Sequence, residues 1–551
     1  MPGKFFIMSS KTFCIRRPFD FATVTYTVTL VLLVPTLLKG FLSLHLADGT
    51  YDFAVAQRYL SGDRIYQDFD EWRTPLSIYW NAMLLQLLPR SVAVISLATL
   101  LSCLIMTGLL TFVVYRETAG SAALTALFFY STMYMGVYHW PRSSYSWNAV
   151  LLSAFAVAVL VNSSAWADDR VRGNALWTFS LIGLLLGTAV GVKQNIGIWM
   201  IVAFLGWTVS RGVLSIDFSL RRMACQAFAL AFGACVVPAA LVVGFYLQGS
   251  LGDFIKIFTE KPKLYLEQMS IPYFGDAPIP QSVRSLPNWV LERLVLVLLL
   301  GGFLVSVLCV VVLLSRRWTG PKGALGWCTA ENVDSRLGFW AILYIASFLS
   351  IFPSADYFHV AMGLPLCLAP LCVFLGRVSG PASAPWVRHL VRRISTGACL
   401  VYSSAMLVAL ANFTFQFVAG NMVLVREFPA QGMIATSETV TFIAKVREAV
   451  IRNVQSDDRL LIAHPYACFL YPFLGLRNPT PFEYFHYGVL SRPQILSVVS
   501  ALDAGEIKAL LIEAPGSGSN PFQVLYGYAT RKMELRATIN LANGFHLFVR
   551  R

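Results

Sequence analysis

The sequence has few charged residues and lacks the patterns that mark disulfide, zinc and nucleotide sites. Asp, Glu, Lys and Arg make up only 13% of its 551 residues, whereas soluble domains contain about a quarter. Its ten cysteines show no C-x-x-C or Cys/His spacing, so they indicate neither a disulfide framework nor a zinc site. A G-x-x-x-x-G-K-[ST] loop is missing, which argues against ATP-driven transport by this chain alone. We find no internal repeat and no low-complexity tract.

The sequence instead contains many long apolar runs. Hydrophobic residues make up 56% of the chain, and the mean hydropathy is +0.63. A bilayer core about 30 Å thick needs roughly 20 apolar residues per spanning helix. The first run follows a basic leader and lacks a small-x-small cleavage site, so we expect a retained helix with a cytoplasmic N-terminus. We expect about eleven spanning segments, near 22–44, 92–114, 119–138, 146–162, 175–192, 195–210, 224–248, 290–314, 337–352, 360–376 and 395–417.

Basic residues set the expected orientation of these segments. The net charge is +14, which the positive-inside rule explains in a membrane protein, so we do not expect nucleic acid as a partner. The apolar stretch 76–88 is too short to span, and treating it as a surface or re-entrant helix places loops 45–91 and 249–289 outside. The loops then left in the cytoplasm carry Arg211, Arg221, Arg222, Arg316, Arg317, Lys322, Arg388, Arg392 and Arg393.

The pattern changes after about Val418, where short helical and strand-like segments alternate. Such alternation predicts a small α/β domain, and an odd number of spans places it outside the membrane. We therefore expect a membrane module over 1–417 and an extracytoplasmic α/β domain over 418–551. The predicted helices are 439–454, 492–502 and 526–535, and the predicted strands lie within 458–466, 507–515 and 544–551.

The first outer loop, 45–91, carries a dense group of acids. One acid stands where the first helix leaves the membrane, a short surface helix is expected over 52–60, and a Gly-Asp turn follows. A carboxylate at the membrane boundary is costly unless it is solvated, paired or functional. For any single acid a solvated loop is the alternative interpretation, and we expect Asp63 to be a solvated turn residue. The acids of this loop are Asp48, Asp52, Asp63, Asp68, Asp70 and Glu71.

The whole pattern of this loop is more specific than any one acid. After the acids, an acidic-aromatic stretch leads into basic-x-Pro-Leu, which begins at Arg73. The segment 45–80 resembles the glycosyltransferase C superfamily, in the branch with the protein O-mannosyltransferases and the lipid A aminoarabinose transferases. The resemblance implies a polytopic membrane fold and an inverting glycosyltransferase. Such an enzyme moves a sugar from a polyprenyl-phosphate donor to a glycan, lipid or protein acceptor.

The resemblance also implies roles for residues of the loop. Asp48 matches the leading acid and would take the acceptor proton as a general base. Asp70 and Glu71 are candidates for the second acid, and Asp52 is a candidate substrate contact. Arg73 would hold the departing phosphate, because an Arg fork suits phosphate geometry. The sequence departs from the family pattern after Asp48, where Gly replaces the usual Glu and the basic residue usual shortly afterwards is absent.

Four further residues lie at the expected outer ends of helices. Lys193, in a very short turn, either snorkels to the interface or stands over the donor phosphate, where the family often has a Lys. Arg142 either anchors the interface beside two tryptophans or binds the same phosphate. Asp356 and His359 share one face of a helical turn and either form a cap or salt bridge or contact donor or acceptor. As a metal site this pair is too sparse, so a divalent metal is not indicated.

Two other classes of protein remain alternatives. A multi-spanning transporter or lipid flippase usually shows internal repeats and polar groups near the middle of the membrane, whereas the polar groups here lie in outer loops. A membrane scaffold would explain the tail but not the first loop. We expect a multi-pass protein of the bacterial inner membrane, with its site facing the periplasm or exterior. Its expected partners are a polyprenyl-phosphate-linked sugar, membrane lipid and an acceptor that the sequence does not identify.

Overall fold

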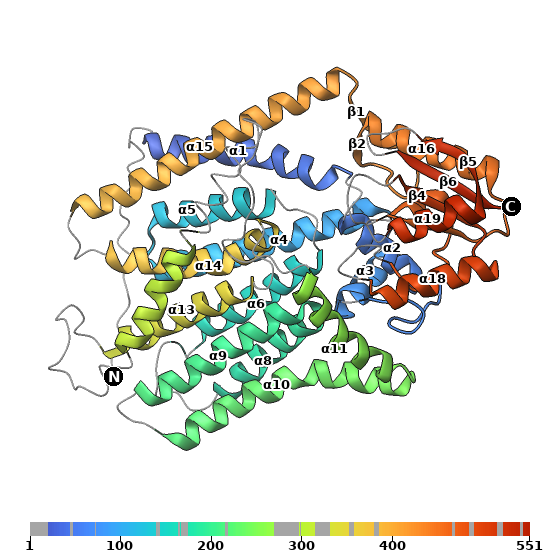
Figure 1. The fold of residues 1–551 in the computed structure, drawn as a ribbon. Helices are drawn as coiled ribbons and strands as arrows, with labels where there is room; N and C mark the ends of the chain where they lie inside the picture. Colours follow the sequence, from blue (N-terminus) through green and yellow to red (C-terminus); the bar gives the residue numbers. More distant parts are fainter. Residues whose placement is uncertain are drawn as a thin grey trace, which may run out of the picture.

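The computed structural model describes most of the chain. It covers residues 20–44, 48–71, 73–138, 144–163, 166, 175–214, 219–268, 297, 299–313, 331–351, 357–379, 385–464, 469–483, 490–514, 522–539 and 544–551. Two parts are visible in Figure 1: a large bundle of helices and, on the right, a small domain built around a sheet.

A helix stands at each position where the sequence predicts a membrane span. By length and apolar composition, seven of the described helices could cross a membrane. Many of their apolar side chains are exposed, as expected for a surface that meets lipid. The bundle comprises α1 (Phe21–Leu42), α4 (Val92–Glu117), α5 (Ala122–Ser131) with the π-helical turn η1 (Thr132–Tyr138), α6 (Ser144–Asn162), α8 (Ala175–Val192), α9 (Gln194–Leu214), α10 (Leu220–Leu247), the helix Leu299–Leu313, α13 (Glu331–Leu349), α14 (Tyr357–Val378) and α15 (Pro385–Val418).

Glycines let two of these helices approach closely. A Cβ built on Gly183 or Gly187 of α8 would collide with the backbone of α10, at Leu230 and Ala234 respectively. Gly233 of α10 meets the backbone of α8 in the same way. Small residues four apart are typical of close helix pairs in membranes, where packing rather than the hydrophobic effect holds helices together. The α8–α10 pair therefore forms a rigid part of the bundle.

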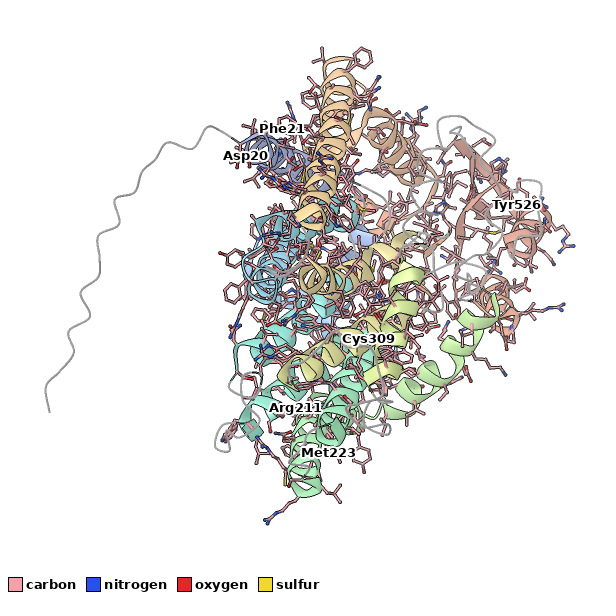
Figure 2. All side chains as sticks on the ribbon, turned by 90° about the vertical axis from the view of Figure 1, so that its left-hand side faces the viewer. Asp20, Phe21, Arg211, Met223, Cys309 and Tyr526 are labelled. Carbon is pink, nitrogen blue, oxygen red and sulfur yellow. The ribbon has the colours of Figure 1, made fainter. Side chains whose placement is uncertain are left out.

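Basic helix ends gather at one end of the bundle. Arg211 is in the last turn of α9, and Arg221 and Arg222 are in the first turn of α10. Figure 2 views the molecule from this end and labels Asp20 and Arg211 there, whereas Figure 1 shows the small domain at the opposite, right-hand end of the bundle. The described basic residues that the sequence assigns to cytoplasmic loops therefore share one end, opposite the small domain.

Two short helices of the first loop, α2 (Asp48–Leu60) and α3 (Leu76–Leu87), lie between the bundle and the small domain (Figure 1). The expected short helix over 52–60 is present, but the expectation that it lies on the surface is wrong. Phe53, Val55 and Ala56 are fully buried. Phe53 and Ala56 belong to the same apolar core as residues of the C-terminal domain, which covers the helix.

The C-terminal part is an α/β domain, as predicted, with β-strand order β3-β4-β6-β5. Strands β3 and β4 are parallel, and β6 is antiparallel to both β4 and β5. The predicted helix over 526–535 is displaced along the chain, because the observed helix begins at Phe522 and ends at Lys532, where a strand begins at once. The elements are β1 (Met422–Leu424) paired with β2 (Ile434–Thr436), α16 (Ser437–Asn453), β3 (Leu460–Ala463), α17 (Leu470–Leu474), α18 (Arg492–Ala504), β4 (Ala509–Glu513), α19 (Phe522–Lys532), β5 (Met533–Ile539) and β6 (Phe545–Arg550).

Helix α15 leads from the bundle into the domain. It ends at Val418 and is followed by Gly420, whose φ of +73° is readily adopted only by glycine. The amide of Asn421 donates to the carbonyl of Gln416, the bond that closes a Schellman motif. Helix α11 (Leu251–Gln268), which follows α10 (Figure 1), packs its apolar side chains against the first loop.

Candidate active site

A buried arginine between two acids forms the centre of the candidate site. Arg73 follows Glu71 in the loop before α3, and Asp52 lies on α2. The Nε and Nη2 atoms of Arg73 each donate to a different Glu71 oxygen at 3.0 Å, and its Nη1 pairs with Asp52. Their side chains are only 5%, 0% and 1% exposed, in the order Arg73, Glu71, Asp52. The three side chains carry two negative charges and one positive charge.

Neutral donors add further hydrogen bonds to the two acids. The Tyr51 hydroxyl donates to Glu71 at 3.0 Å, and the Ser144 hydroxyl donates to Asp52 at 2.6 Å. The Asn81 amide donates in turn to the Ser144 hydroxyl at 3.2 Å. A buried ion pair is stable only when such hydrogen bonds compensate for lost hydration. The cluster is therefore a fixed arrangement, built from the first loop and the start of α6.

The electrostatics of the cluster keep its arginine charged. Burial lowers the pKa of the Arg73 guanidinium, but the charges of Glu71 and Asp52 outweigh this effect and hold the pKa well above its ordinary value. The charge of Arg73 is thus permanent, and it balances one of the two buried carboxylates.

A tyrosine ring joins this cluster to a second cation. The guanidinium of Arg73 and the ammonium of Lys193 each lie 4.9 Å from the centre of the Tyr145 ring. Lys193 sits between α8 and α9, is 9% exposed, and donates to the Ser146 hydroxyl at 2.8 Å. Its ammonium is also 3.5 Å from the sulfur of Met362. Two residues that the sequence places far apart thus meet across one ring.

Sequence analysis missed the residues at the start of α6. The segment was noted for Arg142 and its tryptophans, but the contacts come from Ser144, Tyr145 and Ser146, in the first turn of the helix. The Ser144 hydroxyl donates to Asp52, and the Ser146 hydroxyl accepts from Lys193. The ring of Tyr145 contacts both Arg73 and Lys193. The Ser-Tyr-Ser sequence at a helix start was the available signal, because hydroxyl-bearing residues there face the end of the bundle.

The two neighbouring acids Asp70 and Glu71 face different partners. Glu71 lies in the cluster, whereas the backbone amide of Asp70 donates to the Pro481 carbonyl at 2.6 Å. The Asp70 carboxylate pairs with Lys261 of α11 at 2.7 Å and accepts from Gln494 of α18 at 3.4 Å. Burial raises the pKa of Asp70, and the Lys261 charge opposes that rise. Asp70 therefore joins the first loop to α11 and the C-terminal domain.

A second buried ion cluster fastens α2 to the C-terminal domain. Arg58 donates to Asp63 at 2.6 Å and to the Thr480 carbonyl at 3.0 Å, and it pairs with Glu483. Asp63 also pairs with Arg477. The expectation that Asp63 is a solvated turn residue is wrong: the residue is 4% exposed. Arg477 of the C-terminal domain and Arg58 of α2 together compensate for the lost hydration of the Asp63 carboxylate.

Several predicted residues lie outside this geometry. Helix α2 begins at Asp48, one turn before Asp52, but the side chain of Asp48 lies outside the described residues. Arg142 and Asp356 lie outside them as well. His359 is half-buried in the first turn of α14, three residues before Met362. Among the described residues, no group of three His, Cys, Asp or Glu side chains is placed to hold a metal ion.

Comparison with known proteins adds information at the level of the fold. No family model and no curated protein matches the sequence. The structure is similar to that of ArnT from Cupriavidus metallidurans bound to undecaprenyl phosphate, with a TM-score of 0.52 and 14% identity over 97% of this chain and 98% of that one. The apo state of the same protein matches with the same score and identity, over 96% and 97% of the two chains.

A third match, to the Archaeoglobus fulgidus oligosaccharyltransferase, has a TM-score of 0.46 and 11% identity over 96% of this chain and 73% of that chain. The whole-length similarity to ArnT includes both the helical bundle and the C-terminal domain. The chain therefore shares the fold of ArnT over nearly its whole length, as a polytopic helical bundle with an appended α/β domain.

Proposed function

We propose that this protein transfers a sugar from a polyprenyl-phosphate carrier to an acceptor at the end of the bundle that meets the C-terminal domain. One observation carries the proposal: the fold matches ArnT over nearly the whole of both chains, and that protein was solved with undecaprenyl phosphate bound. The cluster around Arg73 lies at the end of this bundle that meets the C-terminal domain, beside helix ends where a carrier phosphate would meet water.

The proposed reaction is a single displacement with inversion. A hydroxyl or amine of the acceptor attacks the anomeric carbon from the face opposite the phosphate. A bond forms between the acceptor atom and that carbon, and the bond from the carbon to the phosphate oxygen breaks. The phosphate leaves with the bonding electrons and stays on its carrier, and the acceptor proton passes to a carboxylate base. No redox partner is needed, and no metal is invoked.

The contacts divide the two cations by role. All three nitrogens of the Arg73 guanidinium bind Glu71 or Asp52, so we propose that Arg73 chiefly fixes these acids. Lys193 contacts a hydroxyl, a sulfur and the face of Tyr145. We propose that its ammonium binds the carrier phosphate and stabilises the charge that develops there as the sugar departs.

We also assign different roles to the acids of the first loop. We propose Asp48 as the general base, because α2 begins there and Asp52, one turn later, is part of the cluster. Glu71 is favoured over Asp70 as the second acid, since Asp70 is engaged by Lys261 and the C-terminal domain. His359 stays a candidate contact for donor or acceptor, as do Arg142 and Asp356. We further propose that the site faces the periplasm of a bacterial inner membrane.

Binding of undecaprenyl phosphate to the purified protein in detergent tests the proposal, with native mass spectrometry as the readout. We expect wild-type protein to prefer undecaprenyl phosphate over undecaprenol, which lacks the phosphate. Lys193→Met, of similar length and without charge, should weaken binding at least about tenfold, which is 1.4 kcal/mol. Equal binding of the two lipids by the wild type would contradict the proposal.

Transfer is measured separately from binding. Membranes from producing cells fed tritiated sugar supply lipid-linked donors, and label entering the aqueous or acceptor fraction is counted. Asp48→Asn should bind undecaprenyl phosphate like wild type but lower transfer by about 10²- to 10⁴-fold, the usual contribution of a general base. Asp68→Asn, an exposed acid of the same loop, is the matched control and should leave transfer unchanged.

A further inference from the structure

A pocket lies between the first and last helices of the bundle, at the end far from the C-terminal domain. Its volume is about 400 Å³, and it is bounded by the start of α1 and by residues 389–400 of α15. The two helices are joined beneath it by hydrogen bonds of 3.0 Å between Tyr26 and Ser395 and 2.8 Å between Thr29 and Ser403. The pocket is therefore part of the α1–α15 contact and separate from the candidate active site.

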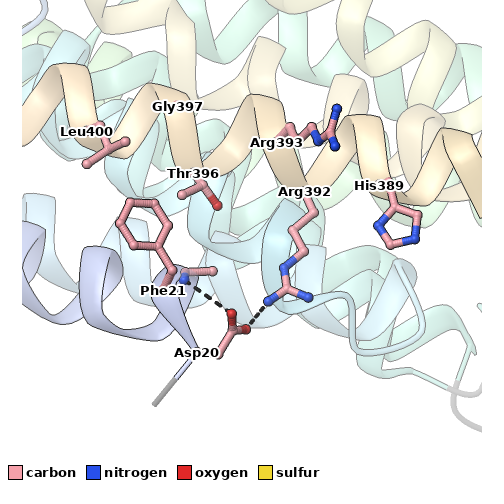
Figure 3. A pocket seen from close by; sticks show the side chains of 9 residues that line it. Asp20, Phe21, His389, Arg392, Arg393, Thr396, Gly397 and Leu400 are labelled. Carbon is pink, nitrogen blue, oxygen red and sulfur yellow. Dashed lines mark hydrogen bonds and ion pairs between the residues drawn. The ribbon is translucent and has the colours of Figure 1, made fainter. Parts of the chain in front are cut away.

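One end of the pocket is polar and contains basic side chains, and the other end is apolar. Figure 3 shows His389, Arg392 and Thr396 on the side of α15 that faces α1, where Arg392 pairs with Asp20. Phe21 and Leu400 lie toward the other end. Arg393 also lines the pocket, but Figure 3 shows its side chain on the side of α15 away from Asp20. Arg392 is therefore the arginine that faces α1 across the pocket, with His389 one turn before it on the same helix.

The apolar end of the pocket continues along the two helices. Both α1 and α15 expose apolar side chains along the bundle, among them Val28, Val31, Val401 and Val408. A ligand that fits the basic end and this apolar surface would carry an anionic head and long apolar chains.

We propose that this pocket binds the headgroup of an anionic phospholipid, whose acyl chains lie along the exposed sides of α1 and α15. Basic pockets between membrane helices are suited to phosphate headgroups, and an anionic leaflet attracts each interfacial Lys or Arg. Arg392 binds the phosphate, and the Thr396 hydroxyl lies on the same side of α15. Asp20 competes for Arg392 and so moderates the affinity. The lipid belongs to the leaflet opposite the C-terminal domain.

Because Asp20 and Arg392 have opposite charges, removing one should strengthen lipid binding and removing the other should weaken it. Native mass spectrometry of the purified protein counts bound phosphatidylglycerol against phosphatidylcholine with the same acyl chains. Arg392→Gln should weaken phosphatidylglycerol binding by about fivefold, the factor expected for one interfacial basic residue. Asp20→Asn should strengthen it, because Arg392 is released from its ion pair. Asn caps a helix as well as Asp does, so the start of α1 is preserved.

Two more variants separate this pocket from general surface charge. Arg388→Gln removes the same charge from the same helix outside the pocket lining and should leave binding unchanged. Gly397→Leu adds volume where a Cβ meets no atom within 4 Å, so the helix tolerates it while the pocket fills and binding falls. A loss with Arg388→Gln equal to that with Arg392→Gln, or weaker binding with Asp20→Asn, would overturn the proposal. Displacement of the lipid by millimolar inorganic phosphate would assign the site to free anions instead.

Discussion

At the scale of single residues, ion pairs of the first loop differ greatly in burial. Arg73 and its two acids are at most 5% exposed, whereas the Arg64–Asp68 pair of the same loop is 53% and 36% exposed. Water screens an exposed pair, and such a pair contributes about 0–1 kcal/mol. Removing one member of a buried pair leaves an uncompensated charge and costs about 3–5 kcal/mol.

We therefore expect Arg73→Ala to lower the stability of the protein by about 3–5 kcal/mol, with Glu71 and Asp52 left buried without their cation. The thermal unfolding midpoint in detergent, followed by tryptophan fluorescence, measures the effect. Arg64→Ala is the control and should change the midpoint little. Equal midpoints for the two variants would mean that the buried cluster relaxes or hydrates when its arginine is removed.

At the scale of elements, the α8–α10 contact depends on glycines that leave no space for a methyl group. Gly233 of α10 faces the Ser180 carbonyl of α8 so closely that any side chain must push the helices apart. Gly244, on the same helix, has no atom within 4 Å of a Cβ placed there. The same substitution at these two positions should therefore act in opposite directions.

We expect Gly233→Ala to destabilise the bundle by about 1–3 kcal/mol, the usual cost of overpacking. Gly244→Ala should be neutral or should stabilise the protein by up to about 1 kcal/mol, because alanine in a helix interior is more favourable than glycine. Unfolding midpoints of the two purified variants provide the comparison. A Gly233→Ala protein as stable as the wild type would show that α8 and α10 can separate without loss.

The elements also show which features could be predicted from the sequence. Spanning helices were predictable because each needs its own apolar run, and the core strands β3, β4 and β6 because each is a compact apolar segment. The boundary between α19 and β5 was not predictable, since the helix pattern runs on past Lys532 and the strand is fixed by pairing with β6. The candidate cations were found individually, but their meeting across Tyr145 depends on tertiary packing.

The burial of the first loop was missed for the same reason. Asp63 reads locally as a turn residue, and its partner Arg477 lies more than 400 positions later in the chain. The sequence around Asp63 does not show that the C-terminal domain, far along the chain, will bury this residue.

At the scale of the whole molecule, Arg58 is a buried polar link between the first loop and the C-terminal domain. It contacts the Thr480 carbonyl and pairs with Glu483 of the domain while also holding Asp63. Burial raises the pKa of Glu483, and the Arg58 charge opposes that rise. Loss of this arginine would leave both acids without their shared cation.

We expect Arg58→Ala to loosen the domain from the bundle and to speed hydrogen exchange at the amide of Asp70, which donates to Pro481 across the junction. Hydrogen–deuterium exchange with mass spectrometry follows peptides that cover the first loop and residues 477–483. Arg452→Ala, which removes an exposed pair with Glu448, is the control. Unchanged exchange in the Arg58→Ala protein would place the strength of the junction in its apolar core instead.

The length of α15 has a consequence for the placement of the domain. Its 34 residues extend about 51 Å at 1.5 Å per residue, well beyond the roughly 30 Å of bilayer hydrocarbon, and β1 begins only a few residues after its end. The direction in which the chain leaves α15 is set by helical phase. One inserted residue would turn the exit by about 100°, whereas seven would nearly restore its direction and move it by about 10 Å along the helix axis. Helix register must therefore match the ion pairs that Arg58 and Asp63 make with the domain.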